Sequence, residues 1–167
     1  MTDPMIALKN ILFTFVVPGT VTVLIPYWLL TPGYTRFSFD LGLFRYGGVL
    51  FLLVGIALYV WCLWHFTFSG RGTPAPIDPT EALVVQGPYR VVRNPMYLAV
   101  LAVLLGEVIL FEAPVLITYI VIWFAIVFCF VLLYEEPALR QQFGDAYRQY
   151  CAEVPRWIPW KLLFRKK

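Results

Sequence analysis

Residues 114–134 read PVLITYIVIWFAIVFCFVLLY, an apolar run without Asp, Glu, Lys or Arg. The hydrocarbon core of a bilayer is about 30 Å thick, and an α-helix of about 20 residues crosses it at about 1.5 Å per residue. Lipid cannot satisfy the free backbone groups of an open sheet edge, so a helix is the structure expected for a single run. The run therefore predicts a membrane-spanning helix over 114–134.

Three further stretches contain few or no charged residues. Asn10–Thr35 and Tyr46–Gly70 have none, and Asn94–Phe111 has only Glu107. Each stretch reaches, or nearly reaches, the length that a span needs. We expect about four transmembrane helices, the last two joined as an antiparallel hairpin, over residues 11–30, 46–68, 96–111 and 114–134.

The composition of the whole chain agrees with several such helices. Hydrophobic residues make up 60% of the 167 residues and charged residues 14%, against about 45–50% and about 25% in soluble globular proteins. So few charges cannot cover a water-soluble domain, and so high a hydrophobic content excludes intrinsic disorder. We therefore expect a single all-α integral membrane domain over residues 1–167.

Lys and Arg are distributed unequally between the two ends of these helices. In a four-span arrangement Arg36 and Arg45 lie on one side, and the other 11 of the 13 basic residues lie on the opposite side. Basic loops are typical of the cytoplasmic side. Both termini and the loop 69–95 are therefore predicted to be cytoplasmic, and the net charge of +3 requires no nucleic acid as partner.

The two cytoplasmic segments carry most of the polar residues. The loop 69–95 has five prolines and three glycines but also the apolar stretch Leu83–Val85, so we expect an ordered loop that folds onto the membrane face. After the last span, apolar side chains recur at helical spacing. They predict an amphipathic helix over about 137–153 at the membrane interface.

Several common site patterns are missing from the sequence. No Cys and His residues have the spacing of a metal site, and GxGxxG, P-loop and G-x-S-x-G patterns do not occur. The sequence therefore predicts no metal and none of the common nucleotide-binding or hydrolase templates of soluble enzymes.

Two segments around the predicted hairpin carry a family resemblance. GPYRVVRNPMY at residues 87–97 resembles the G-x-Y-x-x-x-R-H-P-x-Y segment of the isoprenylcysteine carboxyl methyltransferase family. Glu135-Glu136, Phe143-Gly144-x-x-Tyr147 and Val154-Pro155 resemble its second block, E-E…F-G-x-x-Y…V-P. Phospholipid methyltransferases share a looser version of both blocks. The resemblance covers residues 81–159.

This resemblance implies a multi-pass membrane methyltransferase that uses S-adenosylmethionine. The cofactor would lie between the central loop, the hairpin and the segment after the last span. Ten positions match cofactor contacts of the family: Glu81, Ala82, Leu83, Val84, Tyr89, Asn94, Pro95, Met96, Tyr97 and Glu135.

The residue types suit this cofactor without the resemblance. Glu135 or Glu136, placed where a span meets water, can pair with the ammonium of the cofactor. Tyr89 and Tyr97 can stack on its adenine or face its sulfonium. The structural alternatives are solvated carboxylates at a helix end and ordinary interfacial tyrosines.

Three residues are candidates for a catalytic role. Arg93 can pair with the cofactor carboxylate or a lipid phosphate, Glu136 is the second carboxylate of the pair, and His65 can take a proton from an amine or a thiol. Arg93 and His65 also have structural alternatives. Arg93 can serve only to orient the protein in the membrane, and His65 can be an interfacial residue hydrogen bonded to a loop carbonyl.

Two departures from the family pattern bear on the acceptor. Asn94 replaces the usual His and can still form hydrogen bonds. Val131 stands where the carboxyl methyltransferases use an Arg toward their substrate, and an unpaired carboxylate in the membrane is costly. We therefore predict methyl transfer to a lipophilic small molecule or lipid head group that enters from the bilayer, with an amine or thiol favoured over a prenylcysteine carboxylate.

Two alternatives stay open from the sequence. One is a membrane NADPH-dependent reductase of the sterol-reductase type, whose C-terminal region is distantly similar. The other is a non-catalytic membrane partner protein that retains the fold. Cofactor binding distinguishes the three possibilities.

Overall fold

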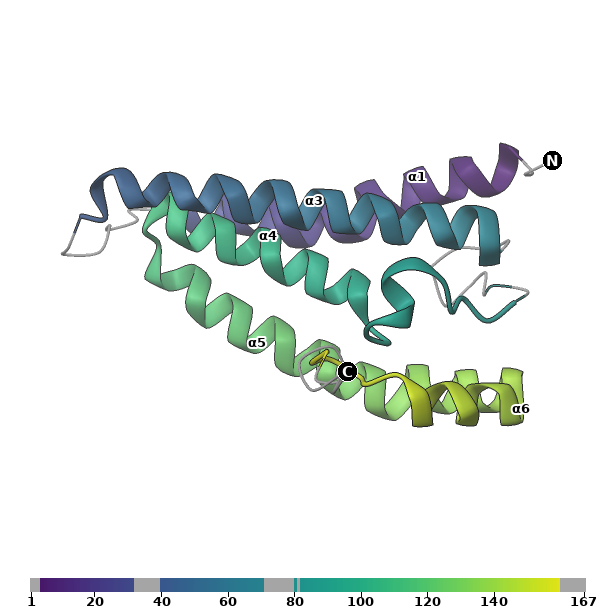
Figure 1. Cartoon of the computed structure of the whole chain (residues 1–167). Helices are drawn as coiled ribbons and strands as arrows, with labels where there is room; N and C mark the ends of the chain where they lie inside the picture. Colours follow the sequence, from purple (N-terminus) through teal and green to yellow (C-terminus); the bar gives the residue numbers. More distant parts are fainter. Residues whose placement is uncertain (1–3, 32–39, 71–79, 81, 160–167) are drawn as a thin grey trace, which may run out of the picture.

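Helices follow one another along the chain and pack side by side (Figure 1). The computed structural model describes residues 4–31, 40–70, 80 and 82–159, and within these residues all regular structure is helical. The start of α1, residues 82–94 and α6 lie toward one end of the molecule, and the turn between α4 and α5 lies at the other (Figure 1). The all-α prediction is confirmed.

The first apolar run forms one helix that begins earlier than the predicted residue 11. α1 (Pro4–Gly19) continues through a π-helical turn, η1 (Thr20–Leu24), into α2 (Ile25–Leu30). Pro26 has no N–H to donate to the preceding turn, and a π turn is one way for a helix to accommodate the lost hydrogen bond.

The second and third runs form a pair of antiparallel helices. A 3-10 turn, η2 (Gly42–Tyr46), leads into α3 (Gly47–His65), which ends in a π turn, η3 (Phe66–Gly70). After the central loop, with its short 3-10 turn η4 (Gly87–Arg90), α4 (Pro95–Phe111) returns along α3. These helices lie where spans 46–68 and 96–111 are predicted.

Glycines bring the backbones of α3 and α4 into direct contact. A Cβ atom on Gly48 would lie 2.5 Å from the carbonyl oxygen of Gly106, and one on Gly106 would lie 2.7 Å from that of Gly48. Further along, a Cβ atom on Gly55 would lie 2.8 Å from the carbonyl oxygen of Ala99. Small residues allow this close approach between membrane helices, so α3 and α4 form the most closely packed part of the fold.

The last apolar run continues past the predicted end at residue 134. α5 (Pro114–Phe130) passes through a π turn, η5 (Val131–Glu135), into α6 (Glu136–Glu153). Pro137 lies in the first turn of α6, where its missing N–H is tolerated. Gly144 has φ 54° and bends α6, because glycine adopts this conformation without steric cost. α6 therefore has the position of the helix predicted over 137–153, but it is bent, and its placement at the membrane interface stays a prediction.

The outer surface of these helices is suited to lipid. Within the described residues, three helical segments are long and apolar enough to cross a membrane: Met5–Leu30, Gly42–Gly70 and Pro114–Glu153. α4 is apolar but has 17 residues, about the lower limit for a span. Large apolar side chains point outward; Phe15, for example, is 76% exposed. The protein is an integral membrane protein, and four crossings stay a prediction.

Candidate active site

A cavity of about 500 Å³ lies between α1, α5, α6 and the central loop. Its volume is in the range of about 300–1,000 Å³ that small-molecule sites occupy. Its lining combines charged and polar side chains with the aliphatic and aromatic side chains of α1 and α5. We call the charged and polar lining residues the polar part of the cavity, and the lining residues of α1 and α5 together with Val131 its apolar part.

Glu135 presents a carboxylate to the polar part of this cavity. The hydroxyl of Tyr97, on α4, donates a hydrogen bond to Glu135 Oε2 at 2.9 Å. Among the described residues, no Lys, Arg or His lies within ion-pair distance of this carboxylate. Glu135 is therefore held in place by a neutral partner and is available to a cation in the cavity.

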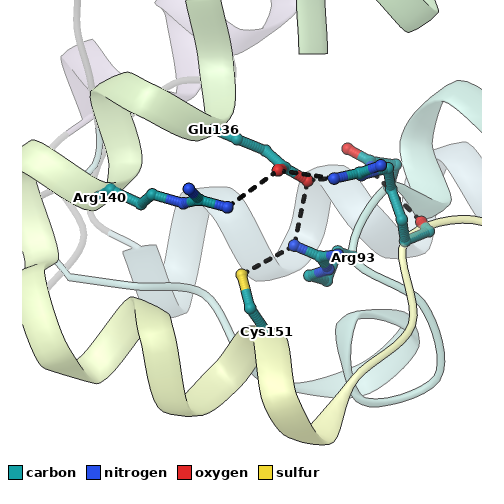
Figure 2. A network of polar contacts seen from close by, with 6 residues as sticks. Arg93, Glu136, Arg140 and Cys151 are labelled. Atoms are coloured by element: carbon teal, nitrogen blue, oxygen red, sulfur yellow. Dashed lines mark hydrogen bonds and ion pairs between the residues drawn. The ribbon is translucent and has the colours of Figure 1, made fainter. Parts of the chain in front are cut away.

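The neighbouring Glu136 has the opposite surroundings (Figure 2). Arg156 pairs with both of its oxygens, at 2.7 and 2.9 Å, and Arg93 Nη1 lies 3.0 Å from Oε1. Arg140 approaches Oε2 at 3.6 Å. The Glu136 side chain is only 5% exposed, so one buried carboxylate holds three guanidinium groups together.

These contacts determine the charge of Glu136. Burial by itself would raise the pKa of the carboxyl, but the hydrogen bonds from Arg156 and the positive charges of Arg93, Arg156 and Arg140 lower it below its ordinary value. The same pairing raises the pKa of Arg156. Glu136 is therefore ionised at neutral pH, and the cluster carries a net positive charge.

Arg93 and Asn94 join the central loop to residues 151–156. The backbone N–H of Arg93 donates to the carbonyl of Pro155 at 2.8 Å, and the Asn94 amide donates to the carbonyl of Arg156 at 3.2 Å. Arg93 Nη1 also donates to Cys151 Sγ at 2.7 Å (Figure 2). The loop just before α4 is thereby fixed against residues that follow it by about 60 positions.

α6 fixes the rest of the described loop from the other side. Tyr150 donates its hydroxyl hydrogen bond to the carbonyl of Tyr89 at 2.7 Å, and the Gln142 amide donates to the carbonyl of Thr80 at 2.9 Å. Leu83 packs with Tyr147 and Tyr150 in one apolar cluster. The bend at Gly144 thus belongs to a helix whose two arms both contact the loop.

Tyr89 is buried where the loop meets η3. Its ring meets Phe66 edge to face, with centroids 5.5 Å apart. Burial raises the pKa of the Tyr89 phenol well above its ordinary value, so the group stays neutral at physiological pH. It can offer a ring face or a hydrogen bond to a ligand, but not a charge.

The apolar part of the cavity contains no charged side chain among its described lining residues. Val131 faces it and is 1% exposed. It is accompanied by five residues from the helices on either side: Phe13, Val17, Ile126, Val127 and Phe130. A ligand group placed here meets hydrocarbon only.

The structure brings together most, but not all, of the predicted site residues. Eight line the cavity: Leu83, Val84, Tyr89, Arg93, Asn94, Tyr97, Glu135 and Glu136. Pro95 is buried at the start of α4, Met96 packs in the helix core, and Ala82 is exposed; none of the three is a lining residue. Glu81 lies outside the described residues.

His65 also lies outside the wall of the cavity. Its Nε2 accepts a hydrogen bond from the Trp61 indole at 3.1 Å, and its Nδ1 lies 3.5 Å from Ser69 Oγ. Its ring packs against Gly87, where a side chain would collide with it. In these contacts His65 supports the turn before Tyr89.

Several lining residues are not among the predicted ones. Phe13 and Val17 come from α1, and Gln142 and Tyr150 come from α6. The Phe143-Gly144-x-x-Tyr147 segment signals that α6 takes part, whereas no pattern in the sequence distinguishes Phe13 and Val17 from lipid-facing residues. Arg156 also goes unpredicted, although it makes the closest contact to Glu136.

The fold and the cavity define a membrane-integral protein with an internal cavity whose lining combines polar and apolar side chains. Residues 43–146 match the family model described as phospholipid methyltransferase, and the chain belongs to that family. The comparisons with curated proteins and with solved structures found no match. Members of this family are methyltransferases. The match therefore supports methyltransferase activity and agrees with the family resemblance seen in the sequence. Among the described residues, no three His, Cys, Asp or Glu side chains gather as a possible metal site.

Proposed function

We propose that the protein transfers a methyl group from S-adenosylmethionine to a lipophilic amine or thiol, either a small molecule or a lipid head group. The observation that carries the proposal is Glu135, a carboxylate that faces the cavity and is hydrogen bonded to the neutral Tyr97. A carboxylate in such a partly dry site binds an ammonium group strongly.

The polar part of the cavity fits the cofactor's other groups. Arg93 belongs to a cluster with more guanidinium groups than carboxylates, which suits the cofactor carboxylate. Tyr89 and Tyr97 offer aromatic rings to the adenine or the sulfonium. Leu83, Val84 and Asn94 complete this side of the site in the proposal.

When bound, S-adenosylmethionine supplies an electrophilic methyl group on sulfur, which is transferred by in-line displacement. The protein's own task is then to hold donor and acceptor in line. Tyr97 orients Glu135, and Glu136 orients Arg93 through their ion pair. Because His65 is engaged by Trp61 and Ser69 outside the cavity wall, we assign it a supporting role. We expect an acceptor that reacts as a neutral amine, or as a thiolate that has already lost its proton to water.

The apolar lining favours an acceptor without a carboxylate. Val131 and its neighbours offer no cation to such a group, and an unpaired charge in this environment costs several kcal/mol. In the proposed orientation the termini and loop 69–95 face the cytoplasm, which supplies the donor. The acceptor arrives from the bilayer.

The test is the affinity for S-adenosylmethionine of the purified protein, measured by calorimetry. Replacing Glu135 by Gln removes the charge but keeps the shape, and should weaken binding by about 1.5–3 kcal/mol. Asp145→Asn is the matched control, because the Asp145 side chain is 95% exposed and lies outside the cavity wall. Equal affinity of the Glu135→Gln variant and the wild type would defeat the assignment, and binding of NADPH in place of S-adenosylmethionine would favour the reductase.

A further inference from the structure

α1 contributes a wall of the cavity although it lies outside the segment that matches the family. Phe13 and Val17 are four residues apart and therefore lie on one face of the helix. Both line the same cavity as Ile126 and Phe130 of α5. Two helices that are distant in sequence thus border its apolar part.

Polar contacts hold α1 in this position. Asn10 donates a buried hydrogen bond to Thr67 Oγ1 at 2.8 Å, and Thr14 Oγ1 lies 3.0 Å from the Tyr59 hydroxyl. At the other end, the Tyr119 hydroxyl on α5 donates to the carbonyl of Val21 at 2.9 Å. The first helix is therefore joined to α3 and to α5 at defined points, and the cavity lies between these contacts.

The apolar part of the cavity reaches the outer surface of the molecule. Val17 is 46% exposed and Ile126 63% exposed, yet both also line the cavity. The exposed surface of the helices faces hydrocarbon in a membrane. A molecule bound in this part of the cavity can thus contact lipid at one end and Tyr97 and Glu135 at the other.

We infer that Phe13 and Val17 select the acceptor by the shape of its hydrocarbon chain. The inference rests on the proposed function and goes further, because it assigns chain selection to a helix outside the family segment. The occupant is a single unbranched alkyl chain with a small, uncharged polar head. The alkyl chain can pack against the hydrocarbon lining between α1 and α5. The polar head can form hydrogen bonds with Tyr97 and Glu135.

The experiment measures kcat/KM of the full chain in lipid nanodiscs with two primary amines, dodecylamine and its branched analogue 2-hexyldecylamine. Val17→Phe should lower kcat/KM for the branched amine at least about tenfold more than for dodecylamine. Phe13→Ala should raise kcat/KM for the branched amine by about tenfold. Effects of this size are typical of a few methylene groups in an apolar pocket. Dodecanethiol replaces dodecylamine in a parallel series, so the head group and the chain are tested separately.

Two residues of the same helix provide matched controls. Val16 and Phe15 are 61% and 76% exposed and do not line the cavity, so Val16→Phe and Phe15→Ala should leave the ratio of the two amines unchanged. A Val17→Phe variant that behaves like Val16→Phe, in a protein that methylates dodecylamine or dodecanethiol, would overturn the inference. Phe13→Ala provides the answer if Val17→Phe does not fold.

A second measurement does not depend on methyl transfer. A dodecylamine with a photoreactive diazirine in its chain should label Phe13, Val17 and residues 126–130, and excess dodecylamine should suppress this labelling. Labelling at Phe15, which does not line the cavity, should persist. If the wild type methylates neither probe but this labelling is suppressed, the proposed function fails, and only the binding of an alkyl chain between α1 and α5 is supported. Labelling at Phe13 and Val17 that dodecylamine does not suppress contradicts the inference.

Discussion

The two sides of α4 are built in different ways. Toward α3, glycines bring the backbones together, and a Cβ atom at Gly48 or Gly106 would collide with the opposite helix. Toward α5, the helices diverge from the hairpin turn (Figure 1), and Tyr97, Val127 and Val131 border a cavity. The first side gains stability from packing, while the second depends on polar contacts at its margins. In this protein one helix thus forms a closely packed pair on one side and borders a cavity on the other.

The largest loss of stability is expected in the polar contacts around Glu136, which hold together the side of α4 that faces α5. Glu136→Gln leaves Arg93 and Arg156 without their buried countercharge and should destabilise the protein by about 3–5 kcal/mol, the cost of breaking a buried ion pair. The measurement is thermal unfolding in detergent. Arg140→Ala removes a partner that is 57% exposed and should cost at most about 1 kcal/mol. Equal effects of the two variants would show that the cluster does not hold this side of α4 together.

The same cluster predicts an acid sensitivity. Because the folded protein lowers the pKa of Glu136 below its ordinary value of 4.5, the stabilisation is complete above pH 4.5 and is lost as the pH falls through the folded-state pKa. Wild type should therefore lose its stability advantage over Glu136→Gln on acidification. A difference between the two proteins that stays constant from pH 7 to pH 3 would contradict the lowered pKa.

The packed side offers a comparison between adjacent glycines. Gly48→Ala places a methyl group against the backbone of Gly106 and Leu110 and should destabilise the protein by about 1–3 kcal/mol. Gly47→Ala meets nothing within 4 Å and should be neutral or stabilise by up to about 1 kcal/mol, since alanine favours the helix. Equal unfolding temperatures for the two variants would mean that α3 and α4 are not in backbone contact.

The smallest effect is expected at the bend of α6. Gly144→Ala meets no neighbouring atom within 4 Å, but φ 54° and ψ −123° form a conformation that residues with a Cβ atom rarely adopt, so the cost should be about 1–2 kcal/mol from the backbone alone. Gly144→Asn should cost about as much, because ψ −123° lies outside the left-handed helical region that Asn tolerates. Variants that are as stable as the wild type would indicate that α6 is straight.

Charge-free stretches predict where the apolar helices of this protein lie, although α1 begins at Pro4, well before the predicted residue 11. α4 begins at Pro95 and ends at Phe111, next to the predicted 96–111, because apolar length and the flanking prolines determine a membrane helix. The continuation through Glu135 into α6 could not be predicted from charge, since the π turn η5 carries the helix past two acidic residues and Pro137.

Some residues of the candidate site could likewise be predicted from the sequence, and others could not. Residues of the loop and of the Glu135-Glu136 pair could be predicted because they form local patterns. The separate roles of Glu135 and Glu136 could not, because they depend on Arg156, which is 20 residues further along the chain. Phe13 and Val17 could not be found either, since an apolar residue looks the same in sequence whether it faces lipid or a cavity.

The length of α4 has a consequence for the membrane itself. Its 17 residues extend over roughly 26 Å, less than the roughly 30 Å of a typical hydrocarbon core. Asn94 and Glu112, both buried, mark the polar limits at its two ends. A span shorter than the bilayer thins the surrounding lipid at a modest cost per ångström. We therefore expect a hydrophobic mismatch beside the cavity, which brings lipid head groups closer to the membrane centre and favours thinner membranes for this protein.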